Sequence, residues 1–170
     1  MGGTSIQKRL GAAVFQAFPR LASWWARRLP SVSGPIPWAE PRRPLREATV
    51  ALITTGGVHL RTQKPFDMDD PDGDPTWREI PVDTPAHELT ITHDYYDHAD
   101  AERDLALVYP VEPLRTLVER RALGRVHPYA YGFMGHIDGP HVETLVRIQA
   151  PEVARRLARA EVDYALLVPA

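Results

Sequence analysis

Two runs of apolar residues without polar alternation, residues 49–54 and 164–168, stand out along the chain. Such runs are typical of strands that are buried on both faces of a parallel sheet. The second run follows an amphipathic stretch at residues 151–160, and only Pro169 and Ala170 come after it. We therefore expect residues 164–168 to form a buried central strand whose covering helix lies outside this sequence.

Between these two runs, segments with strand-like and helix-like patterns alternate. This order indicates an α/β fold with a mainly parallel sheet and flanking helices, here an incomplete Rossmann-like domain. A long acidic and proline-rich loop and a glycine-punctuated loop interrupt it. Strands are predicted at 88–92, 105–109 and 125–131, helices at 113–121 and 151–160, and the two loops at 66–85 and 132–140.

Residues 1–34 differ from the rest because they carry basic but no acidic side chains. Apolar residues recur there at helical spacing, interrupted at Pro19, which predicts an amphipathic helical arm. One interpretation is that the arm packs against the body or a second subunit. The other is contact with a membrane surface, since a basic face with Trp and Phe suits that. We divide the chain into this arm and an α/β domain at residues 35–170, with a proline-rich linker at 30–44.

Composition limits the classes of chemistry. A chain of 170 residues with 44% apolar and 25% charged residues is that of one ordinary globular domain. It contains no cysteine, which excludes a disulfide, a thiolate nucleophile or a cysteine metal site within these residues. No stretch has the length of a transmembrane helix and no cleavage site for a secretory signal is recognisable, so we expect a cytoplasmic location.

Gly56 and Gly57 follow the first apolar run, at the edge of the sheet where open α/β sheets bind ligands. Their backbone amides could approach an anion, although two glycines after a strand often form only a turn. No dinucleotide-binding or phosphate-loop motif is present, which disfavours nucleotide binding. With a net charge of −2 we expect no nucleic-acid partner either.

The densest polar cluster includes His93, Asp97 and His98. These three side chains could ligate a metal, but their spacing matches no recognisable metal site. Histidine and carboxylate groups could instead transfer protons to a substrate.

A structural interpretation of the same cluster pairs Asp94 or Asp97 with Arg78 or Arg103 as an ion pair. His136, in the glycine-punctuated loop, is a further candidate that could be either a site residue or an ordinary loop histidine.

Four short segments follow one another along the chain: residues 51–60 (ALITTGGVHL), 77–81 (WREIP), 92–97 (THxxYD, with Asp100 and Asp104) and 131–135 (YxFMG). Together, and in this order, they resemble the selenoprotein B subunits of the glycine/sarcosine/betaine and D-proline reductases. The resemblance runs from about residue 36 to the end, and the basic arm lies outside it.

In that family, the segment that corresponds to residues 162–169 runs directly into a redox motif. The motif is a selenocysteine or cysteine, a short spacer and a second cysteine. Because selenocysteine is encoded by UGA, which is ordinarily read as a stop, the resemblance implies a recoded UGA directly after Ala170. The chain would then be the amino-terminal part of a selenoprotein. A true split subunit or a decayed gene are the alternatives.

The resemblance implies reductive cleavage of a carbon–nitrogen bond in a small amino acid or amine, such as D-proline, glycine, sarcosine or betaine. A selenolate would attack carbon that is activated by a pyruvoyl group on a partner subunit, and the second cysteine would resolve the adduct. Other reductase subunits and a thiol reductant protein would be partners. His59, Arg61, His93 and Asp97 would hold the substrate carboxylate or supply protons.

Residues 1–170 alone lack the redox residues, so we expect them to be inactive. The competing class is a non-catalytic split or truncated subunit that binds a larger subunit through its uncovered sheet and its arm. A third class, a metal-dependent hydrolase, would use His93, Asp97 and His98.

Overall fold

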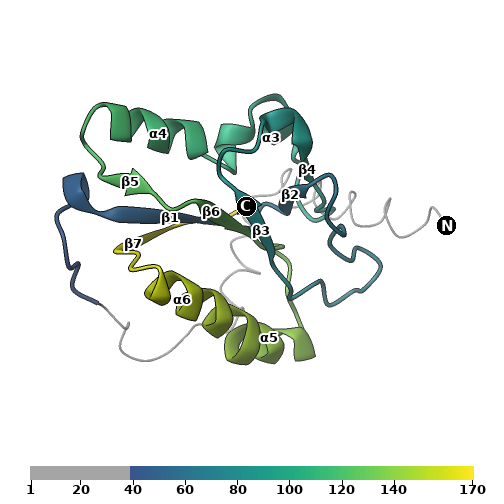
Figure 1. Ribbon diagram of the computed structural model, residues 1–170. Helices are drawn as coiled ribbons and strands as arrows, with labels where there is room; N and C mark the ends of the chain where they lie inside the picture. Colours follow the sequence, from purple (N-terminus) through teal and green to yellow (C-terminus); the bar gives the residue numbers. More distant parts are fainter. Residues whose placement is uncertain (1–38) are drawn as a thin grey trace, which may run out of the picture. The chain divides into compact units, whose positions relative to one another are not determined.

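The sheet is built around β1 (Thr49–Thr54) in the computed structural model, which describes residues 39–170 (Figure 1). β1 pairs in parallel with β7 (Tyr164–Val168) along one edge and with β5 (Arg125–Val126) and β6 (Tyr129–Gly132) along the other. β3 (Arg78–Pro81) then joins β6 in antiparallel orientation. The prediction of an α/β fold with a mainly parallel sheet is confirmed.

A second, two-stranded sheet pairs β2 (Val58–Leu60) with β4 (Leu89–Ile91) in antiparallel register. The chain reaches β2 from β1 through a turn at Gly57, where φ is 70°. A Cβ atom at Gly57 would lie 2.4 Å from the carbonyl oxygen of Thr92, so a side chain there would force the end of β4 away. Glycine at this position thus lets the chain enter β2 close beside the end of β4.

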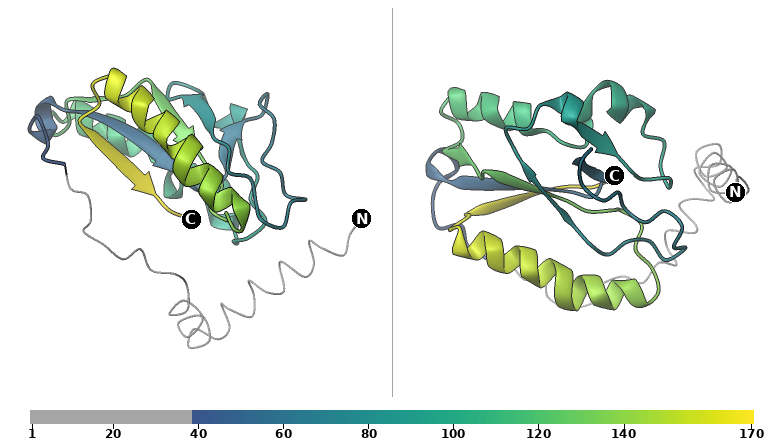
Figure 2. Two further views of the ribbon diagram at one scale, coloured as in Figure 1. Left: turned by 90° about the horizontal axis from the view of Figure 1, so that it is seen from below. Right: turned by 45° about the vertical axis from the view of Figure 1, so that its right-hand side comes forward.

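Helices lie on both faces of the main sheet (Figures 1 and 2). One face carries α4 (Val111–Glu119), and the other carries α5 (Pro140–Thr144), the π-helical η4 (Leu145–Gln149) and α6 (Ala150–Arg159) in one continuous segment. Pro151 has no N–H to donate within the helix, and the wider π turn directly precedes it. The shorter elements are η1 (Leu45–Glu47), η2 (Ala86–Glu88), α3 (Ala99–Arg103) and η3 (Leu105–Leu107).

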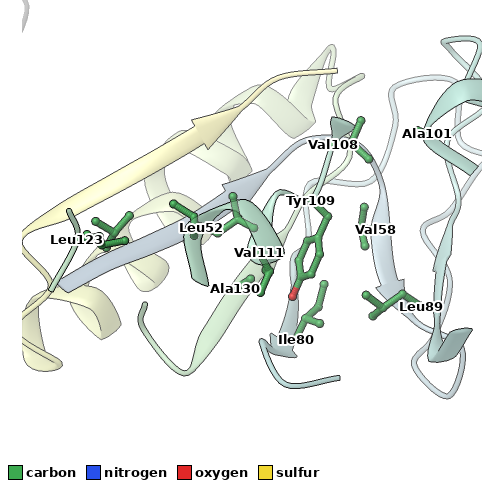
Figure 3. Packing of buried hydrophobic residues seen from close by; sticks show 12 residues of the cluster. Leu52, Val58, Ile80, Leu89, Ala101, Val108, Tyr109, Val111, Leu123 and Ala130 are labelled. Atoms are coloured by element: carbon green, nitrogen blue, oxygen red, sulfur yellow. The ribbon is translucent and has the colours of Figure 1, made fainter. Parts of the chain in front are cut away.

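The apolar run of β1 contributes to two buried clusters, one on each face. Leu52, fully buried, packs with Ile80 and Tyr109 in the larger cluster, next to α4 (Figure 3). Ala51 packs with Tyr131 and with α6 in the smaller one. A strand covered on both faces needs apolar residues at every position, which explains why β1 shows no alternation.

β7 carries the same kind of apolar run, but its burial is different. Leu166 and Leu167 pair with the adjacent β1 residues Leu52 and Ile53, so they lie on opposite faces of the sheet. They are 37% and 67% exposed. Within the described residues β7 is therefore an edge strand that is only partly covered, and its cover by a helix outside this sequence stays a prediction.

The helices predicted at 113–121 and 151–160 are confirmed as α4 and α6, and the last strand as β7. The strand predicted at 105–109 is wrong: the Asp104 side chain accepts a hydrogen bond from the amide of Ala106 and starts the 3-10 turn η3. The strand at 88–92 exists but belongs to the small antiparallel sheet. The one at 125–131 is divided into β5 and β6, and β2 and β3 arise where no strand was predicted.

Residues 41–93 and 98–170 form one compact unit, and residues 94–97 fall outside it. The predicted helical arm lies outside the described residues, so its boundary at residue 34 and its contacts stay predictions. The assignment of residues 35–170 as an incomplete Rossmann-like domain also stays a prediction. Within residues 39–170 no helix is long and apolar enough to cross a membrane.

Candidate functional site

The carboxyl ends of the parallel strands β1, β6 and β7 meet at one edge of the sheet (Figure 1). The amide of Thr55, directly after β1, donates to the carbonyl oxygen of Val168 at 3.0 Å. The amide of Ala170 in turn donates to the Thr55 hydroxyl oxygen at 3.0 Å. The chain that leaves β7 is thus fixed against the loop that leaves β1.

Gly135, in the loop after β6, completes this arrangement. Its amide donates to Nε2 of the buried His93 at 3.0 Å, so the neutral His93 ring carries its proton on Nδ1. A Cβ atom at Gly135 would lie 2.8 Å from the Ala170 carbonyl oxygen and 3.0 Å from His93 Nε2. Only glycine lets these groups come so close. We call Thr55, His93, Gly135 and Ala170 the carboxyl-edge cluster.

Gly56 and Gly57 lie beside this cluster, but their amides are used within the protein. The Gly56 amide donates to the Thr54 hydroxyl oxygen at 3.1 Å, and the Gly57 amide donates to the Phe133 carbonyl oxygen at 2.9 Å. An anion would have to replace these bonds in order to bind there.

His59 is a buried residue of β2 with two short contacts. Its Nδ1 donates to the Leu60 carbonyl oxygen at 2.7 Å, and its Nε2 accepts from the Thr92 hydroxyl at 2.8 Å. Burial lowers the pKa of His59 below its usual value, against the effect of the Leu60 bond, and the positive charges of Arg78 and Arg61 lower it further. A neutral imidazole that bridges β2 and the end of β4 is a structural feature of the small sheet.

The other predicted site residues bond other segments of the chain or fall outside the unit that holds the carboxyl-edge cluster. Arg61 follows β2 and donates from Nε to the His87 carbonyl oxygen at 2.8 Å. His136 donates from Nε2 to the Pro71 carbonyl oxygen at 3.0 Å. Asp97 is exposed and lies in the turn at 94–97, outside the compact unit.

The acidic loop is organised by one buried cation. Arg78 is 8% exposed, donates to the carbonyl oxygens of Lys64 and Pro65, and pairs with Asp74 at 3.4 Å. Its guanidinium also stacks over the Phe66 ring at 4.3 Å. The buried charge is therefore compensated within the loop, and this part of the sheet is structural.

The ion pairs differ from the pairs considered for the polar cluster. Arg103 pairs with Asp100 at 2.8 Å, and Nδ1 of His98 lies 2.9 Å from the Glu102 carboxylate. Among residues 39–170, no group of three His, Cys, Asp or Glu side chains is arranged to hold a metal ion.

Sequence reasoning named His93 but missed Thr55 and the role of Gly135. A signal was present for the turn: a threonine two residues before a glycine often accepts a hydrogen bond from that glycine's amide, as Thr54 does here. The contact of Gly135 with His93 joins residues 42 positions apart, and no local pattern predicts it.

The fold and the cluster define a protein of the open α/β-sheet class with its candidate site at the carboxyl edge of the parallel strands. The family described as glycine/sarcosine/betaine reductase selenoprotein B (GRDB) matches residues 28–170. The chain belongs to this family, which confirms the resemblance found in its sequence motifs.

Two curated relatives carry names from the same reductases. The chain is 32% identical over 136 residues to D-proline reductase subunit gamma of Acetoanaerobium sticklandii, covering 80% of the chain and 54% of the relative. It is 28% identical over 147 residues to glycine reductase complex component B subunit gamma of Symbiobacterium thermophilum, covering 78% and 30%. The chain thus spans about half or less of each relative's length. No solved structure shows a significant match.

Proposed function

We propose that this chain serves as the amino-terminal part of a selenoprotein B-type reductase subunit that acts in reductive carbon–nitrogen bond cleavage. Membership of the family and the reductase names of both relatives support this. The observation that carries it is the hydrogen bond from Ala170 to Thr55, which ends the segment after β7 inside the carboxyl-edge cluster. In the family, the redox motif is expected directly after that segment.

In this proposal the residues of the chain position the reacting groups and do not react themselves. Thr55 fixes the main chain at Ala170, Gly135 allows close approach because it has no side chain, and His93 holds the Gly135 amide. A selenocysteine or cysteine next to this cluster would supply the nucleophile. His93 could accept or return a proton there once its bond to Gly135 opens.

The remaining parts of the proposal rest on the family and on the names of the relatives. The substrate would be a small amino acid or amine of the D-proline or glycine, sarcosine and betaine type. The resemblance to the family further implies, as partners, other reductase subunits, one of them with a pyruvoyl group, and a thiol reductant protein. The cytoplasmic location stays a prediction.

The test is dithiol-dependent reductase turnover by the complete product of the locus, made in a host that inserts selenocysteine, against residues 1–170 alone. We expect turnover from the complete product with its partner subunits and none from residues 1–170, because these contain no cysteine. A UGA codon after Ala170, followed within a few codons by one for cysteine, would be found at the locus. Robust turnover by residues 1–170 alone would refute the proposal.

Variants of two histidines sharpen this test. His93→Ala should lower kcat about tenfold or more, whereas His93→Gln, whose side-chain oxygen can still accept from Gly135, should retain more activity. His87→Ala is the matched control, since the His87 side chain is 81% exposed. Equal activity of all three variants would remove His93 from the site.

The second candidate is a non-catalytic binding subunit, favoured by the exposed apolar residues of β7 and by the absence of cysteine. It predicts a UAA or UAG codon with unrelated sequence downstream, and a complex with a reductase subunit whose turnover does not depend on His93.

A further inference from the structure

β7 combines an open edge with apolar residues on both faces. Leu167 lies on the α6 face and Leu166 on the α4 face, in register with Ile53 and Leu52 of β1. Leu167 is 67% exposed, while Leu52 is fully buried. A strand with this pattern is usually covered on both faces, so the uncovered surface suits a partner that reaches both.

The main chain of β7 points to a strand as the partner. The Val168 carbonyl oxygen accepts from Thr55, so it faces β1. Because main-chain groups alternate between the two edges of a strand, Ala165 and Leu167 direct their N–H and C=O groups to the open edge. These are the groups that an added strand would bind.

A second copy of this chain fits the edge poorly. Two β7 strands related by a two-fold axis would pair antiparallel over at most the five residues of β7, a short contact compared with the roughly 1,600 Å² of a standard stable interface. A parallel strand that arrives with its own helices would cover both residues.

We propose that the open edge of β7 docks a parallel strand from the part of the reductase family that this chain does not span, and that helices of that part cover Leu166 and Leu167. The relative that matches over 54% of its length leaves a segment of suitable size. This rests on the proposed function. A parallel strand beside β7 would end at the edge that holds Thr55, so docking would place the new segment next to the carboxyl-edge cluster.

The experiment measures amide hydrogen exchange of Ala165 and Leu167 by NMR. The probe is the portion of D-proline reductase subunit gamma that the alignment with this chain leaves uncovered, supplied as a separate tagged polypeptide and also joined to the full chain. We expect exchange at Leu167 to slow about tenfold or more with the probe, and the separate probe to co-purify with the chain.

Leu167→Lys should abolish co-purification and restore fast exchange at Ala165, since a charge would be buried under the docked helices. Leu117→Lys, on α4, is the matched control: that leucine is 39% exposed and distant from β7 in the chain, and its variant should bind like the parent. Exchange at Leu52 in β1 reports that the chain stays folded throughout.

Three outcomes would overturn the proposal: unchanged exchange at Leu167 in both formats, binding that Leu167→Lys does not weaken, or loss of protection at Leu52 in the joined protein. A dimer of the chain alone that protects Leu167 would assign the edge to a second copy instead. None of these readouts needs enzyme activity. A docked complex that stays inactive with the partner subunits present would therefore refute the proposed catalysis and leave the docking intact.

Discussion

β1 and β7 are neighbouring parallel strands that are both rich in apolar residues but lie in opposite environments. Every residue of β1 except Ile53 is buried, while three of the five residues of β7 are exposed. β1 has strands along both edges and helices on both faces, whereas β7 has only β1 along one edge within the described residues. An apolar run therefore shows which environment a strand is suited to. Whether the strand is in fact buried depends on the strands and helices that lie beside it.

The largest expected effect is on the buried side of this comparison. Leu52→Ala should lower the free energy of unfolding by about 2–5 kcal/mol, because it removes buried methyl groups and leaves a cavity between β1 and α4. Urea denaturation of residues 1–170, followed by circular dichroism, measures it. A loss below about 1 kcal/mol would mean that β1 is no better packed than β7.

A change at His59 should have an intermediate effect on the free energy of unfolding. It tests whether the side chains of the small sheet are buried as those of β1 are. Because the folded pKa of His59 is lowered, the unfolded state binds more protons as pH falls below about 6.5. The contribution of His59 to the free energy of unfolding should therefore be constant above that pH. Below it, this contribution should decline by at most about 1.4 kcal/mol per pH unit, because one proton is involved.

Replacement of His59 by Gln should remove this part of the decline, as measured by denaturation midpoints between pH 5 and 8. His87→Gln is the matched control, because the His87 side chain is 81% exposed. If the two variants show the same pH dependence, His59 is not buried in its neutral form.

The smallest expected effect is on the exposed side. Leu167→Ser should change the free energy of unfolding of residues 1–170 by no more than about 0.5 kcal/mol, since the side chain is already largely in water. A loss approaching that of Leu52→Ala would erase the distinction between the two strands.

Local patterns were sufficient for the elements whose residues repeat regularly. α4 and α6 have helical spacing, and β1 and β7 are uninterrupted apolar runs, so all four were predictable. The segment at 105–109 is equally apolar, but the Asp104 side chain caps a 3-10 turn there, and a local hydrogen bond outweighs strand propensity. β2 and β3 are short, and their pairing with distant segments, rather than their own residues, creates them.

The candidate site also combines features that local sequence patterns predict with features that only the fold creates. His93 could be named from its polar cluster, but its contact with Gly135 depends on how β4 and β6 are placed. Thr55 is one threonine among several, and only the return of the chain after β7 gives its hydroxyl a partner. The family resemblance implied roles for His59 and Arg61, and in the structure their side chains bond main-chain carbonyl oxygens and the Thr92 hydroxyl.

The π-helical η4 has a consequence for how the long helical segment can evolve. One residue added to an α-helix rotates everything beyond it by about 100°, and a wider turn absorbs that rotation. The stripe of Val153 and Leu157 can therefore stay on the sheet while α5 takes its orientation from His141, which bonds Asp70 of the acidic loop at 2.9 Å. The two halves of the segment are free to diverge separately, one following the sheet and the other the loop.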